Sequence, residues 1–127
     1  MAIKRESCDV WFSKAVRFRD GSCLYTGRTD LLECCHIYGR RARIGRWDLA
    51  NAVTLTHSAH RHFTENPIAF HDWLVQTLGE AHMEILRDKQ NGILKTTRAV
   101  RLEIAKHYRD ELRKAEGDSS YTMVSYN

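Results

Sequence analysis

Three side chains in the middle of the chain have the types and spacing that hydrolysis of a phosphodiester requires: His36, Asn51 and His60. A neutral imidazole can take a proton from a water molecule that attacks a phosphate, and a divalent cation can polarise that phosphate. Histidine also binds divalent cations through a ring nitrogen. The segment 33–63 therefore predicts a nuclease site that depends on one metal ion.

Each of these side chains has a distinct expected role. We expect His36 to act as the general base, provided that a backbone carbonyl holds its other ring nitrogen. His60 is the expected metal ligand, and Asn51 is expected to brace the intervening loop through side-chain to backbone hydrogen bonds. Cys35 is a second candidate ligand, although its soft sulfur suits Mn²⁺ or Zn²⁺ better than Mg²⁺. The predicted cofactor is one divalent ion, Mg²⁺ or Mn²⁺, with Zn²⁺ as a further candidate.

Basic side chains crowd the segment that follows His36. The formal net charge of the chain is +4, and four arginines lie close together: Arg40, Arg41, Arg43 and Arg46. Such clusters neutralise backbone phosphates and make binding depend on salt. We expect these arginines to bind DNA phosphates. The basic series in 95–114 is interleaved with acidic residues and indicates a solvated helix face instead.

The local sequence pattern predicts an α+β fold around this site. Asp9 can cap an amphipathic helix over 9–19, which Asp20 and Gly21 end. The expected order continues with strands at 22–26 and 31–37 joined as a hairpin by the turn 27–30, a loop over 39–50, a strand at 51–56 and a short helix over 57–66. Strand, loop, strand and helix in this order outline a ββα unit.

The second half of the chain is predicted to be helical. Apolar residues recur at helical intervals in 67–79, a further helix is expected in 80–88, and Thr96 or Thr97 can cap a long final helix. We expect a single domain, 1–127, which comprises an N-terminal helix with the nuclease core (9–66), a helical extension that serves as scaffold or dimer surface (67–116) and a short flexible polar tail (117–127).

Composition restricts the compartment and the class of protein. A chain of 127 residues with 43% hydrophobic residues can bury one modest core. No apolar run has the length of a membrane span, and the charged start MAIKRESCDVWF lacks the apolar segment of a signal peptide. The four cysteines are then expected to be reduced thiols or metal ligands. The sequence thus predicts a cytoplasmic protein with no membrane partner.

The pattern of Cys35-His36, Asn51 and His60 is similar to the motif of the HNH, or ββα-metal, endonucleases. The wider frame resembles the phage NinG/Rap recombination nucleases in the segments DVWFSKAVRFRD, CLYTG, ECCHIYGRR, RWDLAN, FHDWLVQTLG and IAKHYRDELRK. This resemblance implies a small ββα-metal core with an N-terminal helix and a C-terminal helical extension. It also implies cleavage of branched DNA, such as Holliday junctions, in the cytoplasm of an infected bacterium. Two coordinated nicks resolve a junction, so a homodimer is expected.

Members of this family often stabilise the fold with zinc bound by two CxxC pairs, and this chain departs from that pattern. Cys23 is paired with Thr26, while Thr56 and Ala59 stand at the positions of the second pair. Because a tetrahedral zinc site needs four soft or imidazole ligands, no structural zinc is expected. An irregular site remains as an alternative, assembled from Cys23, Cys34 and His57.

Two motif positions also differ from the family. Many HNH enzymes carry Asp or His before the base, where this chain has Cys35. In the NinG/Rap frame that position often binds no metal, so Cys35 is either a ligand or a packed side chain. Alternation along a strand places it on the opposite face from Cys34. The third motif position is often Asn in that family, where this chain has His60, and both residue types can bind a metal.

Two other classes of function stay open. The missing zinc cysteines and the presence of Cys35 favour a catalytically weak DNA-binding module that kept its basic surface. An exposed apolar patch on the C-terminal helices would instead favour a protein-interaction factor built on the same fold. The leading prediction is a metal-dependent HNH endonuclease that acts on branched or duplex DNA.

Overall fold

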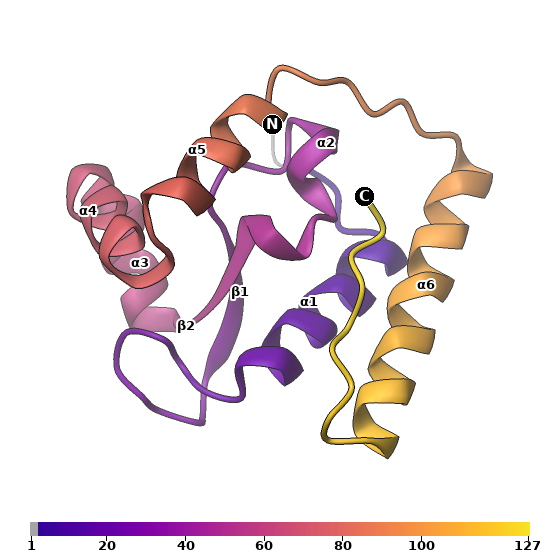
Figure 1. Ribbon diagram of the computed structural model, residues 1–127, viewed down its shortest axis with the longest axis horizontal. Helices are drawn as coiled ribbons and strands as arrows, with labels where there is room; N and C mark the ends of the chain where they lie inside the picture. The colour runs from indigo at the N-terminus through magenta and orange to yellow at the C-terminus, as the bar shows by residue number, and fades with distance from the viewer. Residues whose placement is uncertain (1–2) are drawn as a thin grey trace.

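A two-stranded antiparallel sheet lies at the centre of the computed structural model, which describes residues 3–127 (Figure 1). Strand β1 (Leu32–His36) pairs with β2 (Ala52–Thr56), and the register sets His36 opposite Ala52. The helices of the described chain are α1 (Ser7–Asp20), α2 (Arg43–Arg46), α3 (His57–Glu65), α4 (Pro67–Leu78), α5 (Glu80–Lys89) and α6 (Arg98–Gly117), and a 3-10 turn, η1, spans Leu49–Asn51. The expected α+β class is confirmed.

The sheet separates two apolar clusters. Helices α1 and α6 pack together on one side of it, whereas α3, α4 and α5 gather on the other (Figure 1). Successive strand residues point to opposite faces, so Cys34 packs against the α1–α6 cluster and Cys35 lies within the α3–α5 cluster. The predicted alternation of the two cysteines is confirmed. The sheet thereby fixes which strand residues face α1.

Helix α1 matches its predicted range and ends as expected. Its last turn is closed by Gly21, which adopts φ 70° and donates its backbone N–H to the carbonyl of Arg17. The predicted cap, however, was wrong. Glu6 is the N-cap, and Asp9 occupies the third helical position, where its carboxylate accepts from the backbone N–H of Glu6 at 2.8 Å.

The predicted hairpin between 22–26 and 31–37 was also wrong. Residues 22–27 form a turn in which the N–H of Gly27 donates to the carbonyl of Cys23, and β1 pairs with β2 instead. Every residue of β2 is buried, whereas Leu24 and Tyr25 are exposed. Pairing with β2 therefore removes more apolar surface from water, and the order β1, β2, α3 results.

The segment 39–50, predicted as a loop, contains α2 and most of η1. Trp47 is fully buried between them, and its backbone carbonyl accepts from the hydroxyl of Tyr108 on α6. Asp48 caps η1 by accepting from the N–H of Ala50 at 2.9 Å. The segment 39–50 is therefore ordered by a buried tryptophan and two short helical turns, although its sequence has no helical or strand periodicity in its apolar residues.

The helices of the second half agree with the prediction. Pro67 begins α4, Gly79 ends it, and the hydroxyl of Thr97 caps α6 by accepting from the N–H of Val100. None of the described helices is long and apolar enough to cross a membrane.

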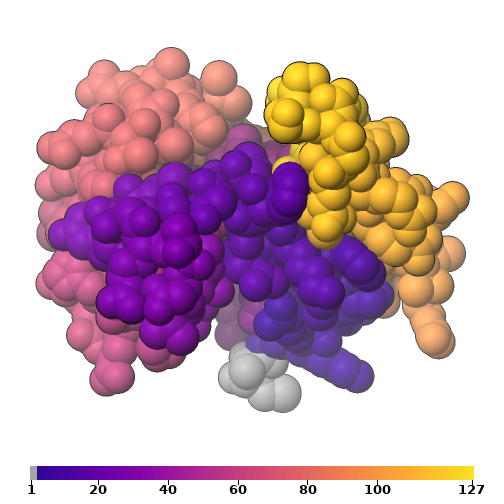
Figure 2. Space-filling model, turned by 90° about the horizontal axis from the view of Figure 1, so that it is seen from below, coloured from indigo at the N-terminus to yellow at the C-terminus, as the bar shows by residue number. Residues whose placement is uncertain are grey.

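The C-terminal segment differs from the flexible tail that was predicted. It runs back between α1 and α6, where Figure 2 shows it in yellow against both (Figures 1 and 2). Glu111 accepts from the hydroxyl of Tyr121 at 2.7 Å and from the N–H of Val124 at 2.6 Å. Met123 and Tyr126 pack against the α1–α6 cluster. A few apolar side chains in this mostly polar segment therefore pack it against α1 and α6.

Candidate functional site

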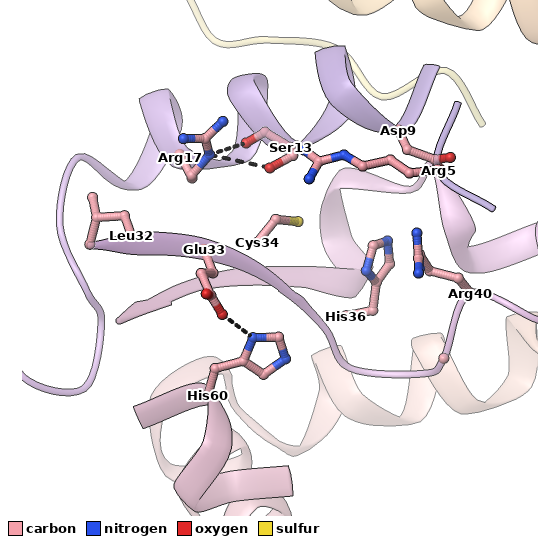
Figure 3. A pocket seen from close by; sticks show the side chains of 11 residues that line it. Arg5, Asp9, Ser13, Arg17, Leu32, Glu33, Cys34, His36, Arg40 and His60 are labelled. Atoms are coloured by element: carbon pink, nitrogen blue, oxygen red, sulfur yellow. Dashed lines mark hydrogen bonds and ion pairs between the residues drawn. The ribbon is translucent and has the colours of Figure 1, made fainter. Parts of the chain in front are cut away.

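A cleft of about 710 Å³ lies beside β1 and brings together residues that are far apart in the sequence (Figure 3). Helix α1 forms one wall, β1 runs along the cleft, and α3 and the segment after β1 contribute the remaining sides. The side chains that the chemistry below concerns are Arg5, Asp9, Ser13, Arg17, Glu33, Cys34, His36, Arg40 and His60. Of the residues singled out in the sequence, the cleft therefore unites His36, Arg40 and His60.

His36 is half-buried and held from two sides. Its Nε2–H donates to the backbone carbonyl of Arg46 at 2.8 Å, and its ring stacks on Phe12 with centroids 5.5 Å apart. Burial lowers the pKa of His36, the Arg46 carbonyl opposes this, and the charge of Arg40 lowers the pKa further. The neutral tautomer with the proton on Nε2 leaves Nδ1 as an acceptor. The carbonyl contact required of a general base is present.

His60 shares a carboxylate with His57. The Nδ1–H of His60 donates to Oε1 of Glu33 at 2.9 Å (Figure 3). Nδ1 of His57 contacts Oε2 of the same carboxylate at 2.8 Å. Burial raises the pKa of Glu33, but the hydrogen bonds from the two histidines outweigh burial and hold the pKa below its ordinary value. Glu33 is thus a carboxylate that fixes the tautomer of His60 and leaves Nε2 for another partner.

Sequence reasoning missed Glu33, because its position beside α3 follows only from the pairing of β1 with β2. Helix α3 begins directly after β2, and β2 pairs with β1, so a carboxylate near the start of β1 must lie close to the first turn of α3. The hairpin prediction placed β1 against the wrong strand and concealed this proximity.

Asn51 braces the loop in the way the sequence predicted. Its side chain is fully buried, accepts from the N–H of Tyr38 and donates to the carbonyls of Tyr38 and Gly45, each at 2.9 Å. A Cβ at Gly45 would lie 2.8 Å from Nδ2 of Asn51, so the contact needs glycine there. Asn51 is not among the residues that line the cleft, and its hydrogen bonds hold the loop that follows β1.

Cys35 lies away from the cleft. It is buried in the α3–α5 cluster, and burial raises the pKa of its thiol to about 12. A metal ligand must be a thiolate, which this environment disfavours. We therefore withdraw Cys35 as a metal ligand; it is a packed side chain.

The four arginines after β1 divide into different roles. Arg40 lines the cleft beside His36, and Arg41 is exposed outside it. Arg43 donates to the hydroxyl of Thr96, and Arg46 is buried. The expectation that Arg46 binds DNA was wrong, because its guanidinium donates to both oxygens of Asp9 at 2.6 and 2.9 Å. The backbone carbonyl of Arg46 contacts His36 in the cleft, whereas its charged side chain is bound to Asp9.

The cleft offers one imidazole nitrogen to a divalent ion, Nε2 of His60, because Nδ1 of that ring contacts Glu33. Mg²⁺ and Mn²⁺ keep several water ligands and need few protein groups. Within residues 3–127, the ligand atoms of Cys23, Cys34 and His57 do not form a closely spaced group, so the irregular zinc site does not assemble.

A second group of metal-binding residue types lies at the start of α1. Within residues 3–127, the one set of three such residues with closely spaced ligand atoms is Glu6, Cys8 and Asp9. Glu6 and Asp9 form the capping box of α1, and Asp9 also binds Arg46. The two carboxylates of this group already have partners in the fold.

The α+β fold and its cleft were compared with known proteins. Searches against models of protein families, curated proteins and solved structures gave no match. The assignment of a function consequently depends on the geometry and chemistry of the cleft.

Proposed function

We propose that the protein is a metal-dependent DNA endonuclease of the HNH, or ββα-metal, type. The observation that carries this proposal is the meeting of His36 from β1 and His60 from α3 in one cleft that arginines line. The order β1, β2, α3 agrees with such a core. A neutral base, a metal-binding imidazole and a positive surface are the three components that phosphodiester hydrolysis requires.

His36 is the general base of the proposed reaction. Its Nδ1 removes a proton from a water molecule while the oxygen of that water forms a bond to phosphorus and the bond to the 3′ oxygen breaks. The Arg46 carbonyl keeps the proton of the neutral ring on Nε2, and the lowered pKa keeps Nδ1 free to accept near neutral pH. Arg40, beside His36, binds a non-bridging oxygen of the phosphate.

His60 is the proposed metal ligand, with Glu33 as the group that orients it. When bound, Mg²⁺ or Mn²⁺ polarises the phosphate and stabilises the departing 3′ oxygen. The Glu33 carboxylate accepts from Nδ1 of His60, which directs the lone pair of the ring to Nε2. Zn²⁺, which also binds imidazole nitrogen, is the other candidate ion.

The substrate, assembly and location are parts of the same proposal. The resemblance of the chain to the NinG/Rap nucleases favours branched DNA over linear duplex. A homodimer would give the two cuts that a junction requires. The corresponding location is the cytoplasm of a bacterium that carries the phage.

Cleavage of labelled DNA tests the proposal. Wild-type protein is incubated with a four-way junction and with a matched linear duplex, in Mg²⁺ and then in Mn²⁺. We expect cleavage of the junction to exceed that of the duplex, and His36→Ala and His60→Ala to lower the rate about 100-fold or more. The matched control is His71→Ala, because His71 is exposed on α4 and outside the cleft. Full activity in His36→Ala would refute the assignment of the base.

One observation favours a second function, a DNA-binding module with weak catalysis. Because Cys35 is buried away from the cleft, the metal site has one fewer candidate ligand than the motif suggested. Salt-dependent binding of DNA without cleavage in either metal would support this reading.

A further inference from the structure

Two cationic side chains that the proposed chemistry does not use also line the cleft. Arg17 lies on helix α1, and Arg5 lies just before the helix begins. The Nε–H of Arg17 contacts the carbonyl and the hydroxyl of Ser13, both at 3.2 Å. These contacts orient the guanidinium, and its terminal nitrogens make no hydrogen bond within residues 3–127. Figure 3 shows Arg17, Ser13 and Arg5 along the α1 side, across from β1.

The carboxylates of the cleft do not neutralise these arginines. Within residues 3–127, no ion pair joins Arg5, Arg17 or Arg40 to a carboxylate. Asp9 is bound to Arg46 at 2.6 Å, and Glu33 is bound to two histidines. The cleft therefore presents three cations without acidic partners.

Cys34 lines the cleft and packs toward the α1–α6 cluster. Burial raises the pKa of Cys34 to about 12, so its thiol is neutral there. Guanidinium groups in such a partly enclosed setting bind phosphate through paired N–H donors. From Asp9 to Arg17 the wall is about 12 Å long at 1.5 Å per residue, which exceeds the room that one phosphate needs.

We propose that Arg17 and Arg5 bind a phosphate that flanks the one held by Arg40 at His36, so that the site takes a nucleic-acid strand with several phosphates rather than an isolated phosphodiester. This inference rests on the proposed function, because it takes His36 as the point of hydrolysis. It adds a binding wall on α1 that the motif around His36 does not contain.

Binding of a short single-stranded oligonucleotide tests the wall without cleavage. The measurement uses full-length His36→Ala protein, labelled DNA and a series of salt concentrations. Adding Arg17→Gln should weaken binding about tenfold and reduce the slope of log affinity against log salt by about 0.7. The affinity of Arg17→Lys should lie between those of the His36→Ala parent and Arg17→Gln, since lysine keeps the charge but loses the paired donors.

The matched control for Arg17 is Arg61→Gln in the same background. Arg61 is exposed on α3, contacts Glu65 and lies outside the cleft. We expect it to leave affinity and salt slope within about twofold of the parent. Equal effects of Arg17→Gln and Arg61→Gln, or an unchanged salt slope in Arg17→Gln, would overturn the proposal.

Competition distinguishes a strand from a free anion. Inorganic phosphate at matched ionic strength should displace the oligonucleotide far more weakly than an unlabelled strand does. Displacement by inorganic phosphate at the concentration of phosphate groups in the competing strand would assign the arginines to a free anion and overturn the proposal.

Turnover by protein with an intact His36 adds an independent measurement. Arg17→Gln should lower kcat/KM at least fivefold more for the oligonucleotide than for bis(p-nitrophenyl) phosphate, mainly through KM. An equal loss on both substrates would mean that Arg17 supports the fold of the site, against the proposal. Failure of the wild-type protein to cleave either substrate would count against the nuclease, whereas the binding measurements would still decide the role of Arg17.

Discussion

His36 depends on a residue that sequence reasoning assigned to a different task. The Arg46 carbonyl accepts its Nε2–H, while the Arg46 side chain is buried against Asp9 and stacks on the ring of Trp47 at 4.9 Å. The buried ion pair therefore fixes the backbone that fixes the tautomer of the base. At this scale the charge of Arg46 stabilises the fold, and its carbonyl orients the ring of His36.

The titration of His36 gives the first prediction. Because burial lowers its pKa from 6.5, the acidic limb of the pH dependence of kcat/KM should lie below pH 6.5. The unfolded chain then binds the proton more tightly than the folded one, so the contribution to stability is complete above pH 6.5 and is lost as the pH falls below it. NMR titration of the histidine ring measures the pKa directly, and a value above 6.5 would contradict the prediction.

Glu33 gives the second prediction. Glu33→Gln removes the negative charge that directs the proton of His60 to Nδ1, so the affinity for Mn²⁺ should fall about 10–100-fold. Calorimetry with Mn²⁺ measures this affinity without any cleavage. Glu65→Gln is the matched control, because Glu65 is exposed and contacts Arg61 alone among the ion pairs of the described chain. Unchanged affinity for Mn²⁺ in Glu33→Gln would contradict the prediction that Glu33 orients His60.

The elements show which parts of the fold the sequence could predict. Most helices can be located in the sequence from their periodic apolar positions and from residues that mark helix ends, namely Gly21, Pro67 and Gly79. The observed ranges of α1, α3, α4, α5 and α6 agree closely with the predicted ones. Short β-prone runs occur at 22–26, 31–37 and 51–56, and no local signal says which two pair. Burial of β2 decides the pairing, and burial is a property of the whole fold.

The candidate site was predictable to a similar degree. His36, His60 and Arg40 were identified because their types and spacing follow a motif in the sequence. Glu33 was missed because its distance from His60 depends on strand register. Arg17 was missed because only the docking of α1 brings it to the cleft. Arg46 was misassigned because neighbouring arginines look alike until one of them is buried.

The ion pair between α1 and α2 gives the third prediction. The side chains of Asp9 and Arg46 are 6% and 5% exposed, so Asp9→Ala leaves a buried guanidinium with Glu6, at 3.7 Å, as its remaining acidic partner. Removing one partner of such a pair costs about 3–5 kcal/mol in the free energy of unfolding. Urea denaturation measures the loss. Asp30→Ala, which breaks an exposed pair with Arg28, should unfold close to wild type.

Asp9 also makes this loss depend on pH. Burial raises its pKa, but hydrogen bonds from Arg46, Glu6 and Trp47 outweigh burial and lower the pKa below 3.8. The stabilisation is therefore complete above pH 3.8 and is lost as the pH falls through the lower folded-state pKa. A difference between Asp9→Ala and wild type that stayed constant down to acid pH would contradict this assignment.

The cleft lies where the two halves of the molecule meet. Helix α1 belongs to the α1–α6 cluster, α3 belongs to the α3–α5 cluster, and the sheet is shared between them. The site is consequently sensitive to how these clusters are held together. The C-terminal segment contributes on the α1–α6 side, since Asn127 donates to the carbonyl of Ile44 at 2.7 Å and Tyr126 packs into the cluster.

Removal of residues 118–127 gives the fourth prediction. Glu111 is 3% exposed and would lose its bonds from Tyr121 and Val124 while it keeps the ion pair with Lys114, and a hydrogen bond to a charged group contributes about 1.5–3 kcal/mol. Loss of the apolar contacts of Met123 adds to this. The chain that ends at Gly117 should therefore unfold at lower urea than full-length Ser119→Ala, whose substitution is exposed. Equal midpoints would mean that the segment does not stabilise α6, whereas a lower midpoint would show that the polar tail is part of the folded core.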